Sequence, residues 1–273
     1  MSDERTPRLW AIGMVKNEND IIGDCIDHAL TICDRVFFLD NGSSDGSWET
    51  LQAKAAQHPD RCMVEQYHER FTDGAIRVIY NRYHHELPPD HWWMKIDSDE
   101  FLLEDPRPIL RRATAAGKDA VTVWQVQFLY TDVDHARVVA GQDDPTRPIA
   151  ERRRHYRTDW RETRLWRNFP DQSWDDADLG YPEQVRSFHS EHPLNRHYQY
   201  RTPDQIGNRL ALRKGSKFFS HVQTLDWAEM VTPASSCSVW EPGTTPRIHQ
   251  VGYYRNLAGQ KLRALRRKLT RAD

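Results

Sequence analysis

The chain has 273 residues and a net charge of -2, because 38 lysines and arginines face 40 aspartates and glutamates. This balance excludes a protein that binds a polyanion through overall charge alone, and the length allows one large domain or two small ones. Four cysteines without a Cys-x-x-Cys spacing exclude a disulfide scaffold and suit a reducing compartment.

The N-terminal residues are charged and lack the apolar core of a signal peptide. No window approaches the roughly 18 apolar residues of a membrane-spanning helix. We therefore expect a cytoplasmic protein.

The first hundred residues alternate short apolar runs with amphipathic segments. Residues 9–15 and 35–40 are short and apolar, which is typical of buried strands. Residues 21–33 repeat apolar side chains at helical spacing. The expected order is strand 9–15, helix 21–33, strand 35–40, helix 48–56, strand 64–67, helix 76–87 and strand 94–97. This alternation predicts an α/β fold with a parallel sheet and helices on both faces.

Polar residues follow three of these strands at their carboxyl ends. They are Asn17 and Glu18 after the first strand, Asp40 and Asp45 after the second, and Asp97 and Asp99 after the last. Parallel sheets bind their ligands at this edge. Neighbouring carboxylates repel each other and are costly to desolvate, and a divalent cation removes that cost. The alternative is a solvated acidic turn without a ligand.

Three motifs carry a family resemblance, at residues 15–18, 39–47 and 96–102. In this order they resemble glycosyltransferase family 2, in particular the bacterial branch that acts on lipopolysaccharide core and surface glycans. The resemblance covers about the first 105 residues. It implies the GT-A fold, a Rossmann-like mixed and mainly parallel sheet flanked by helices. It also implies a nucleotide-sugar donor, a divalent metal and inversion at the anomeric carbon.

The same resemblance assigns roles to the polar residues. Asn17, Glu18 and Asp40 would contact the nucleoside, with Asp45 close by. Asp97 and Asp99 would form the Asp-x-Asp pair, one near the ribose and one on the metal, and both are candidate metal ligands. Oxygen ligands beside a diphosphate favour Mg²⁺ or Mn²⁺ over zinc, and the cation would stabilise charge on the leaving group.

Beyond residue 105 we expect a helix to about residue 116 and a strand over 120–130. Residues 131–160 show no clear periodicity and indicate a long irregular excursion. Eight arginines lie between Arg147 and Arg167, including Arg152, Arg153 and Arg154. We expect a solvated basic patch, and the functional alternative is a site for a phosphate-bearing acceptor.

The candidate general base lies in the second half of the chain. Residues 165–168 and 180–186 resemble the family segment that supplies this base, although Pro182 and Gln184 depart from its pattern. An inverting transfer needs one carboxylate to take the proton of the acceptor hydroxyl. Glu183 is our candidate. The competing carboxylates are Asp175, Asp176 and Asp178.

His197 is the candidate for a further metal ligand. Residues 196–206 look like the family's His-Tyr segment, and several GT-A enzymes use a late histidine on the metal. The alternative is a core histidine hydrogen-bonded to backbone. A helix should follow over 203–214, capped by Thr202 with Pro203 in its first turn.

Residues 257–271 combine leucines on one face with surrounding basic residues, which predicts a basic amphipathic helix. It could lie at the inner face of a membrane that bears a lipid-linked acceptor, or pack its leucines on the domain. We therefore expect one GT-A domain over 1–255 with this helix at 256–273. Residues 8–105 would form the nucleotide-sugar half and 106–255 the acceptor half.

These features predict an inverting, metal-dependent transferase of the hexosyltransferase type. It would move a sugar from a nucleotide-sugar to the hydroxyl of a glycan, a lipid-linked acceptor or another acceptor, in bacterial glycan or lipopolysaccharide synthesis. One alternative is transfer to a modified DNA base or a protein side chain; nucleic acid is not the favoured partner. Others are an inactive sugar-binding module and a zinc hydrolase that uses His189, His192 and His197.

Overall fold

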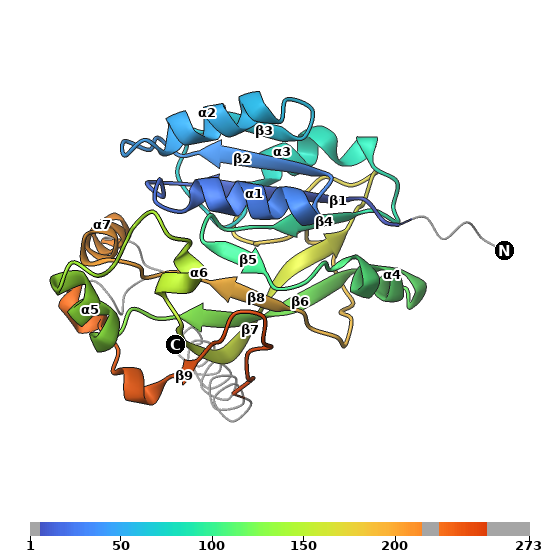
Figure 1. The fold of residues 1–273 in the computed structure, drawn as a ribbon. Helices are drawn as coiled ribbons and strands as arrows, with labels where there is room; N and C mark the ends of the chain where they lie inside the picture. Colours follow the sequence, from blue (N-terminus) through green and yellow to red (C-terminus); the bar gives the residue numbers. More distant parts are fainter. Residues whose placement is uncertain (1–5, 215–223, 250–273) are drawn as a thin grey trace, which may run out of the picture. The chain divides into compact units, whose positions relative to one another are not determined.

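The computed structural model describes residues 6–214 and 224–249 (Figure 1). The predicted basic helix at 256–273 lies outside the described residues. By internal contacts the chain forms two compact units. The first unit holds the described residues up to Val123 together with Arg161–Asn195, and the second holds Trp124–Trp160 together with the described residues from Arg196 onward.

The N-terminal part of the first unit alternates strands and helices as the sequence predicts. Its elements are β1 (Leu9–Val15), α1 (Ile22–Ile32), β2 (Arg35–Asp40), α2 (Ser47–Gln57), β3 (Cys62–Gln66), α3 (Arg77–Tyr83), β4 (Trp92–Lys95), β5 (Glu100–Leu102) and α4 (Arg107–Ala115). A single 3₁₀ turn at His84–Glu86 follows α3, so the predicted helix over 76–87 ends earlier than expected.

Three strands have residues in both units: β6 (Ala120–Phe128), β7 (His155–Arg167) and β8 (Leu194–His197). The second unit adds α5 (Asp132–Val139), α6 (Ile149–Arg152), α7 (Pro203–Arg213), β9 (Ser238–Val239) and 3₁₀ turns at Ala228–Met230 and Ala234–Ser236. The expectation of an irregular excursion over 131–160 was wrong. Thr131 and Asp134 form a capping box that begins α5, and β7 starts at His155.

The sheet is mixed. In the described residues its strand order is β3-β2-β1-β4-β7-β6-β8-β5, with β9 beside β7. The first four strands of this order pair in parallel, and β4 pairs with β7 antiparallel. The predicted α/β class with a mixed sheet and flanking helices is confirmed, and the parallel pairs β1–β2, β1–β4 and β2–β3 are formed by N-terminal strands.

The register of the parallel strands aligns their carboxyl ends. Val15 lies opposite Asp40, and Lys95 lies opposite Ile12. Because each parallel strand advances by the same rise per residue, Asp97 follows at the level of the last residues of β1. The chain therefore leaves β1, β2 and β4 at one edge of the sheet.

An aromatic cluster forms the core of the first unit on one face of these strands. Trp10 and Trp93 meet edge to face at 5.4 Å between ring centroids, and Tyr80 of α3 packs on Trp93 at 5.3 Å. Trp166 and Trp174 complete the cluster at 5.7 Å. Helices α1 and α2 lie in front of the same strands in Figure 1, with α3 behind them. The second unit has a smaller core around Tyr130, Ile206 and Leu210.

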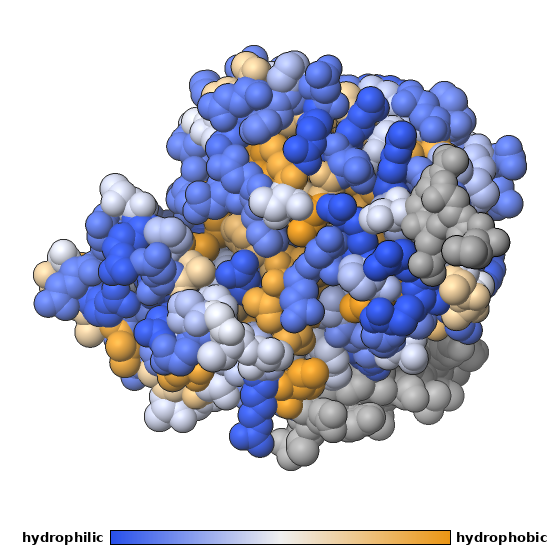
Figure 2. Space-filling view, turned by 45° about the vertical axis from the view of Figure 1, so that its right-hand side comes forward, coloured by the Kyte–Doolittle hydropathy of each residue, from blue (hydrophilic) through white to orange (hydrophobic). Residues whose placement is uncertain are grey.

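Polar side chains cover most of the face shown in Figure 2, with apolar side chains exposed between them. Exposed large apolar residues of the first unit include Phe71 and Phe188. Over the residues described, no helix combines the length and the apolar composition needed to cross a bilayer.

Gly13 allows β1 to approach the turn after β4, and its replacement by alanine should be severe. A Cβ atom there would lie 2.3 Å from the carbonyl oxygen of Ile96 and 2.7 Å from a ring carbon of Phe38. We expect G13A to lower the free energy of unfolding by about 3 kcal/mol or more, because a backbone carbonyl cannot yield locally. Urea denaturation measures this loss.

The matched control is G23A on α1, whose Cβ would meet only ordinary contacts at 3.6 Å. Its unfolding free energy should stay within about 1 kcal/mol of the wild type, since alanine suits a helix better than glycine does. Equal stabilities of the two variants would contradict the close approach of β1 to Ile96.

Candidate functional site

The loops after β1 and β2 are hydrogen-bonded to each other. The backbone N–H of Asn17 donates to Ser43 Oγ at 2.9 Å, and the N–H of Ser44 donates to Asn17 Oδ1 at 2.8 Å. Lys16 Nζ donates to the carbonyl oxygens of Asn41 and Gly42. Asn17 has a φ of 55°, a left-handed conformation that asparagine tolerates better than most residues. The structure thus brings these two loops together at the carboxyl edge.

Ser47, at the start of α2, links the two loops below this surface. Its buried hydroxyl accepts the N–H of Glu18 at 2.8 Å and donates to Asp45 Oδ1 at 2.6 Å. The other carboxylate oxygen of Asp45 accepts the N–H of Asn19 at 3.0 Å. Both oxygens of Asp45 therefore hold the loop, and Glu18 is buried beside it. The sequence patterns did not single out Ser47, which follows the N-cap residue Gly46 and is therefore not a cap of α2.

Asp40 ends β2 and is fully buried. Its Oδ2 accepts the N–H groups of Gly42 and Ser43, both at 3.0 Å. Its Oδ1 is buried and has no hydrogen-bond partner within the part of the chain that the structure describes. A buried carboxylate oxygen without a donor is costly, so this atom is suited to accept a hydrogen bond from a bound molecule. The predicted contact with a nucleoside stays a prediction.

The acidic motif after β4 surrounds an arginine. Arg164 Nη2 lies 2.8 Å from Asp97 Oδ2, 2.5 Å from Glu100 Oε1 and 2.9 Å from Glu162 Oε2. The antiparallel pairing of Met94 with Leu165 places Arg164 beside the end of β4. Sequence reasoning missed this residue. Its signal was a charged side chain two positions before Trp166, on the same face of β7 as that buried tryptophan.

Burial and charge act on Arg164 in opposite directions. Burial lowers the pKa of its guanidinium, but Asp97, Glu100 and Glu162 raise it, and the net pKa lies well above that of an ordinary arginine. Arg164 is thus a permanent cation inside the motif. The sequence pattern indicated only a metal as relief for the carboxylate repulsion, and the structure shows that a guanidinium supplies part of it.

The two aspartates of the motif differ in exposure. The Asp97 side chain is 39% exposed, whereas Asp99 is fully buried. Within the described ranges there is no group of three or more His, Cys, Asp or Glu side chains placed to hold a metal. Asp97 is therefore the carboxylate of the pair that faces solvent. A small cavity beside it is lined by Lys95, Ile96, Glu100, Arg164 and Asn195, among others.

The motif could hold a divalent cation only with ligands from a bound substrate. Asp97, Glu100 and Glu162 carry three potential negative charges around the single guanidinium of Arg164. Mg²⁺ is commonly held by one or two carboxylates together with phosphate oxygens of the substrate. The half-exposed Asp97 meets that requirement, and the remaining ligands would come from a bound diphosphate.

Glu183 is held in a turn of the first unit. Its two carboxylate oxygens accept the N–H of Asp175 at 3.1 and 3.3 Å. The preceding residue, Trp174, is fixed to α3 because its backbone exchanges hydrogen bonds of 2.7 and 2.8 Å with the amide of Asn81. Gly180 of the same segment adjoins Lys95 of β4. The competing carboxylates at 175, 176 and 178 are exposed. The role of Glu183 as base stays a prediction.

The histidines of the other sequence hypotheses lie in different surroundings. His197 is buried in the second unit, where its Nδ1 contacts Gln127 at 2.7 Å, and its role on a metal stays a prediction. In the first unit, the His192 ring contacts Thr122 at 2.8 Å and the guanidinium of Arg161. Burial and Arg161 lower the pKa of His192. A zinc ion at that ring would meet the neighbouring positive charge.

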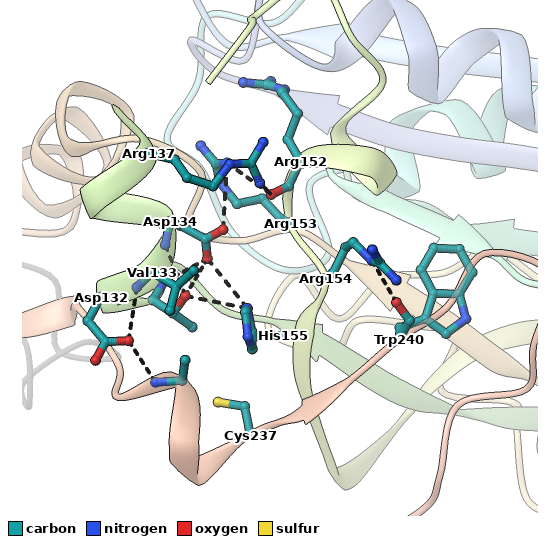
Figure 3. A network of polar contacts seen from close by, with 12 residues as sticks. Asp132, Val133, Asp134, Arg137, Arg152, Arg153, Arg154, His155, Cys237 and Trp240 are labelled. Carbon is teal, nitrogen blue, oxygen red and sulfur yellow. Dashed lines mark hydrogen bonds and ion pairs between the residues drawn. The ribbon is translucent and has the colours of Figure 1, made fainter. Parts of the chain in front are cut away.

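The expectation of a solvated arginine patch was wrong for its central residues, shown in Figure 3. Arg153 is fully buried, and its guanidinium forms a bidentate contact with the Asp143 carboxylate at 2.8 and 2.7 Å. Arg152 is also buried and contacts Asp143 at 3.2 Å. The Nε–H of Arg153 donates to the carbonyl oxygen of Arg201 at 2.7 Å. Composition alone could not show that Asp143 folds back onto these arginines.

No protein-family model matches the chain, and no curated protein matches it. A crystal structure of GalNAc-T7 with UDP, GalNAc and Mn²⁺ aligns at 11% identity and a TM-score of 0.35. It covers 47% of this chain and 24% of that one.

A second similar structure is assigned as a glucose-1-phosphate thymidylyltransferase of Bacillus anthracis in complex with sucrose. It aligns at 12% identity and a TM-score of 0.31, covering 45% of this chain and 55% of that one. This chain therefore spans about a quarter of the first structure and about half of the second. Similarities this distant carry no functional conclusion.

The hydroxyl of Ser47 should stabilise the carboxyl edge measurably. Replacing Ser47 with alanine removes the acceptor of the Glu18 N–H and a donor to Asp45 in a buried position. We expect a loss of about 1–3 kcal/mol in the free energy of unfolding. The control is S44A, an exposed serine on the same loop, which should change stability by less than about 0.5 kcal/mol. A loss no larger than that of S44A would contradict the linking role of Ser47.

Arg153 should be essential for the stability of the second unit. In R153M the buried Asp143 side chain loses its bidentate partner, so we expect the free energy of unfolding to fall by about 3–5 kcal/mol. R147M is the control, because Arg147 forms an exposed ion pair with Glu151, four residues later in the chain. It should cost less than about 0.5 kcal/mol. Calorimetric unfolding of both variants distinguishes a buried ion pair from a solvated patch, for which the two losses would be alike.

Proposed function

We propose that this chain is an inverting, divalent-cation-dependent glycosyltransferase that moves a sugar from a nucleotide-sugar to an acceptor hydroxyl. The observation that carries the proposal is the alignment of three polar strand ends. Asp40 ends β2 opposite Val15, and Asp97 follows β4 at the same edge. An edge that holds a buried carboxylate oxygen without a donor in the described residues, together with an outward-facing carboxylate, is suited to a ligand that has both hydroxyl donors and phosphates.

The nucleoside would bind at the loops after β1 and β2. Asp40 Oδ1 would accept a hydrogen bond from the nucleoside, since its Oδ2 is already occupied by Gly42 and Ser43. The hydrogen bonds of Asn17 with the Ser43 hydroxyl and the Ser44 N–H hold this surface in one shape before the ligand arrives. Such preorganisation lowers the entropic cost of binding.

The diphosphate would lie toward Asp97. A bound Mg²⁺ or Mn²⁺ would there stabilise the negative charge that develops on the leaving nucleoside diphosphate. Asp97 would hold the cation through its exposed carboxylate. The fully buried Asp99 would support the turn beneath it instead of facing the ligand directly.

Glu183 would act as the base. Its carboxylate would accept the proton of the acceptor hydroxyl while the hydroxyl oxygen attacks the anomeric carbon opposite the diphosphate. The N–H of Asp175 orients this carboxylate, and the contact between Trp174 and Asn81 fixes the segment on α3. The acceptor class that we propose is a glycan or lipid-linked hydroxyl in bacterial glycan synthesis, on the basis of the family 2 resemblance.

A nucleotide screen tests the donor site. We expect one of UDP, GDP, CDP or dTDP to raise the melting temperature when Mn²⁺ is present, because a ligand that binds only the folded state stabilises it. D40N should lower the affinity for that nucleotide by about tenfold or more, since the variant loses a charged hydrogen-bond acceptor. No shift with any nucleotide, with or without Mn²⁺, would contradict the proposed function.

The matched control for D40N is D34N. Asp34 precedes β2 at the opposite, amino edge, where it accepts the N–H of Leu9 at 2.8 Å. D34N removes the same charge but should leave nucleotide affinity unchanged. Equal losses of affinity in both variants would show that overall charge, and not the position of Asp40, determines binding.

The base assignment has its own test. E183Q should bind the nucleotide-sugar as the wild type does but release nucleoside diphosphate about 10²–10⁴-fold more slowly, because it cannot take the proton. D175N, D176N and D178N are the matched controls from the same exposed segment. If one of these three loses turnover while E183Q keeps it, the base is that aspartate and not Glu183.

A further inference from the structure

We propose that Arg164 is a positioning residue that occupies the place of a divalent cation on Asp97, so that Mg²⁺ or Mn²⁺ binds with the nucleotide diphosphate and only weakly to the free protein. The inference rests on the proposed function and adds an order of binding to it. It concerns how the chain controls its cation affinity before the donor arrives.

The contacts of Arg164 show a guanidinium placed as a metal would be. One nitrogen, Nη2, lies within 3 Å of carboxylate oxygens of Asp97, Glu100 and Glu162. The side chain is 5% exposed, so solvent screens these contacts only weakly. The acidic motif thus folds around an internal positive charge, with the carboxylates drawn toward one point.

The two carboxylates that Arg164 contacts differ in their need for a counter-charge, and this difference indicates a role for Arg164 beyond neutralising a buried carboxylate. Glu100 is almost fully buried and needs a counter-charge for stability. Asp97 is 39% exposed and could be hydrated without an arginine. The contact of Arg164 with Asp97 therefore reaches beyond what the burial of Glu100 requires. Its effect is to fix the one carboxylate of the pair that faces solvent.

The charge of Arg164 has opposite effects on the free cation and on the cation with its nucleotide. A divalent cation that approaches Asp97 alone is repelled by a guanidinium 2.8 Å from the same carboxylate. A diphosphate brings negative charge to the same place, which attracts both the cation and the guanidinium. The favourable complex then contains the cation, the diphosphate and Arg164 together.

Arg164 differs in this respect from other paired arginines of the first unit. Arg112 forms two hydrogen bonds with Glu191 at 2.7 and 2.6 Å, but both side chains are exposed. That pair is a guanidinium–carboxylate contact without burial and without a place in the acidic motif. Arg112 is therefore the matched control for removing one guanidinium from one carboxylate.

The test is a calorimetric titration of the nucleotide-free protein with Mn²⁺ alone. Wild-type protein and R112Q should bind Mn²⁺ weakly and alike. R164Q should bind it at least about tenfold more tightly, because the repelling charge is gone while the carboxylates remain. R164K keeps a positive charge on a shorter side chain, which ends before the position of Nη2, so the repulsion at Asp97 weakens and the affinity should lie between the two.

R164Q could fail to fold, since it removes the positive charge that contacts the buried Glu100. Recovery of the folded circular dichroism spectrum with millimolar Mn²⁺, but not with NaCl of equal ionic strength, would then support the proposal. Without such recovery R164K decides, because a Mn²⁺ affinity equal to that of the wild type would overturn it.

The result also separates this inference from the proposed function. If Mn²⁺ affinity is the same in R164Q and wild type while a nucleotide still binds, Arg164 is only structural and the glycosyltransferase assignment stands. If R164Q gains Mn²⁺ affinity but no nucleotide diphosphate binds any variant, the positioning role stands and the assignment fails.

Discussion

Carboxylates that lie side by side at the end of a buried strand repel each other, and the motif after β4 depends on how that repulsion is relieved. Arg164 relieves part of it from β7, by contacting Asp97, Glu100 and Glu162. It keeps a permanent positive charge, because the three carboxylates raise its pKa more than burial lowers it. The remaining negative charge faces solvent through Asp97, and this is the feature on which the proposed cation and diphosphate site depends.

The rest of the first unit holds that motif beside a second polar surface. Parallel register aligns the ends of β1, β2 and β4, and Gly13 lets β1 approach the carbonyl of Ile96. Ser47 and Asn17 join the loops after β1 and β2 by hydrogen bonds to side chains and backbone. Asp40 thus ends β2 at this edge with one oxygen bonded to the loop backbone and the other buried without a donor among the described residues. A rigid edge with these two kinds of carboxylate would bind the nucleoside and the phosphates of one ligand at once.

The sequence was sufficient where the signal is local. Apolar runs predicted β1 and β2, and the Thr202–Pro203 pair predicted the start of α7, where Thr202 indeed accepts the N–H of Gln205. The sequence failed where partners are distant. Arg164 lies 67 residues from Asp97, so no spacing rule connects them. Arginine is usually solvated, so the sequence predicted an exposed Arg153. Its burial depends on Asp143, which lies in a stretch without periodicity. Long-range ion pairs of this kind are determined by strand pairing and loop folding, which a local pattern does not encode.

The central claim is that one ligand with a diphosphate joins a divalent cation to Asp97. Anomalous diffraction from crystals grown with Mn²⁺, with and without the nucleoside diphosphate that stabilises the protein, tests it most directly. A manganese peak at coordination distance from Asp97, with the nucleoside beside Asp40 and only in the crystals that contain nucleotide, is the predicted result. A nucleotide bound away from Asp40, or no manganese beside Asp97 when it is bound, would contradict the account.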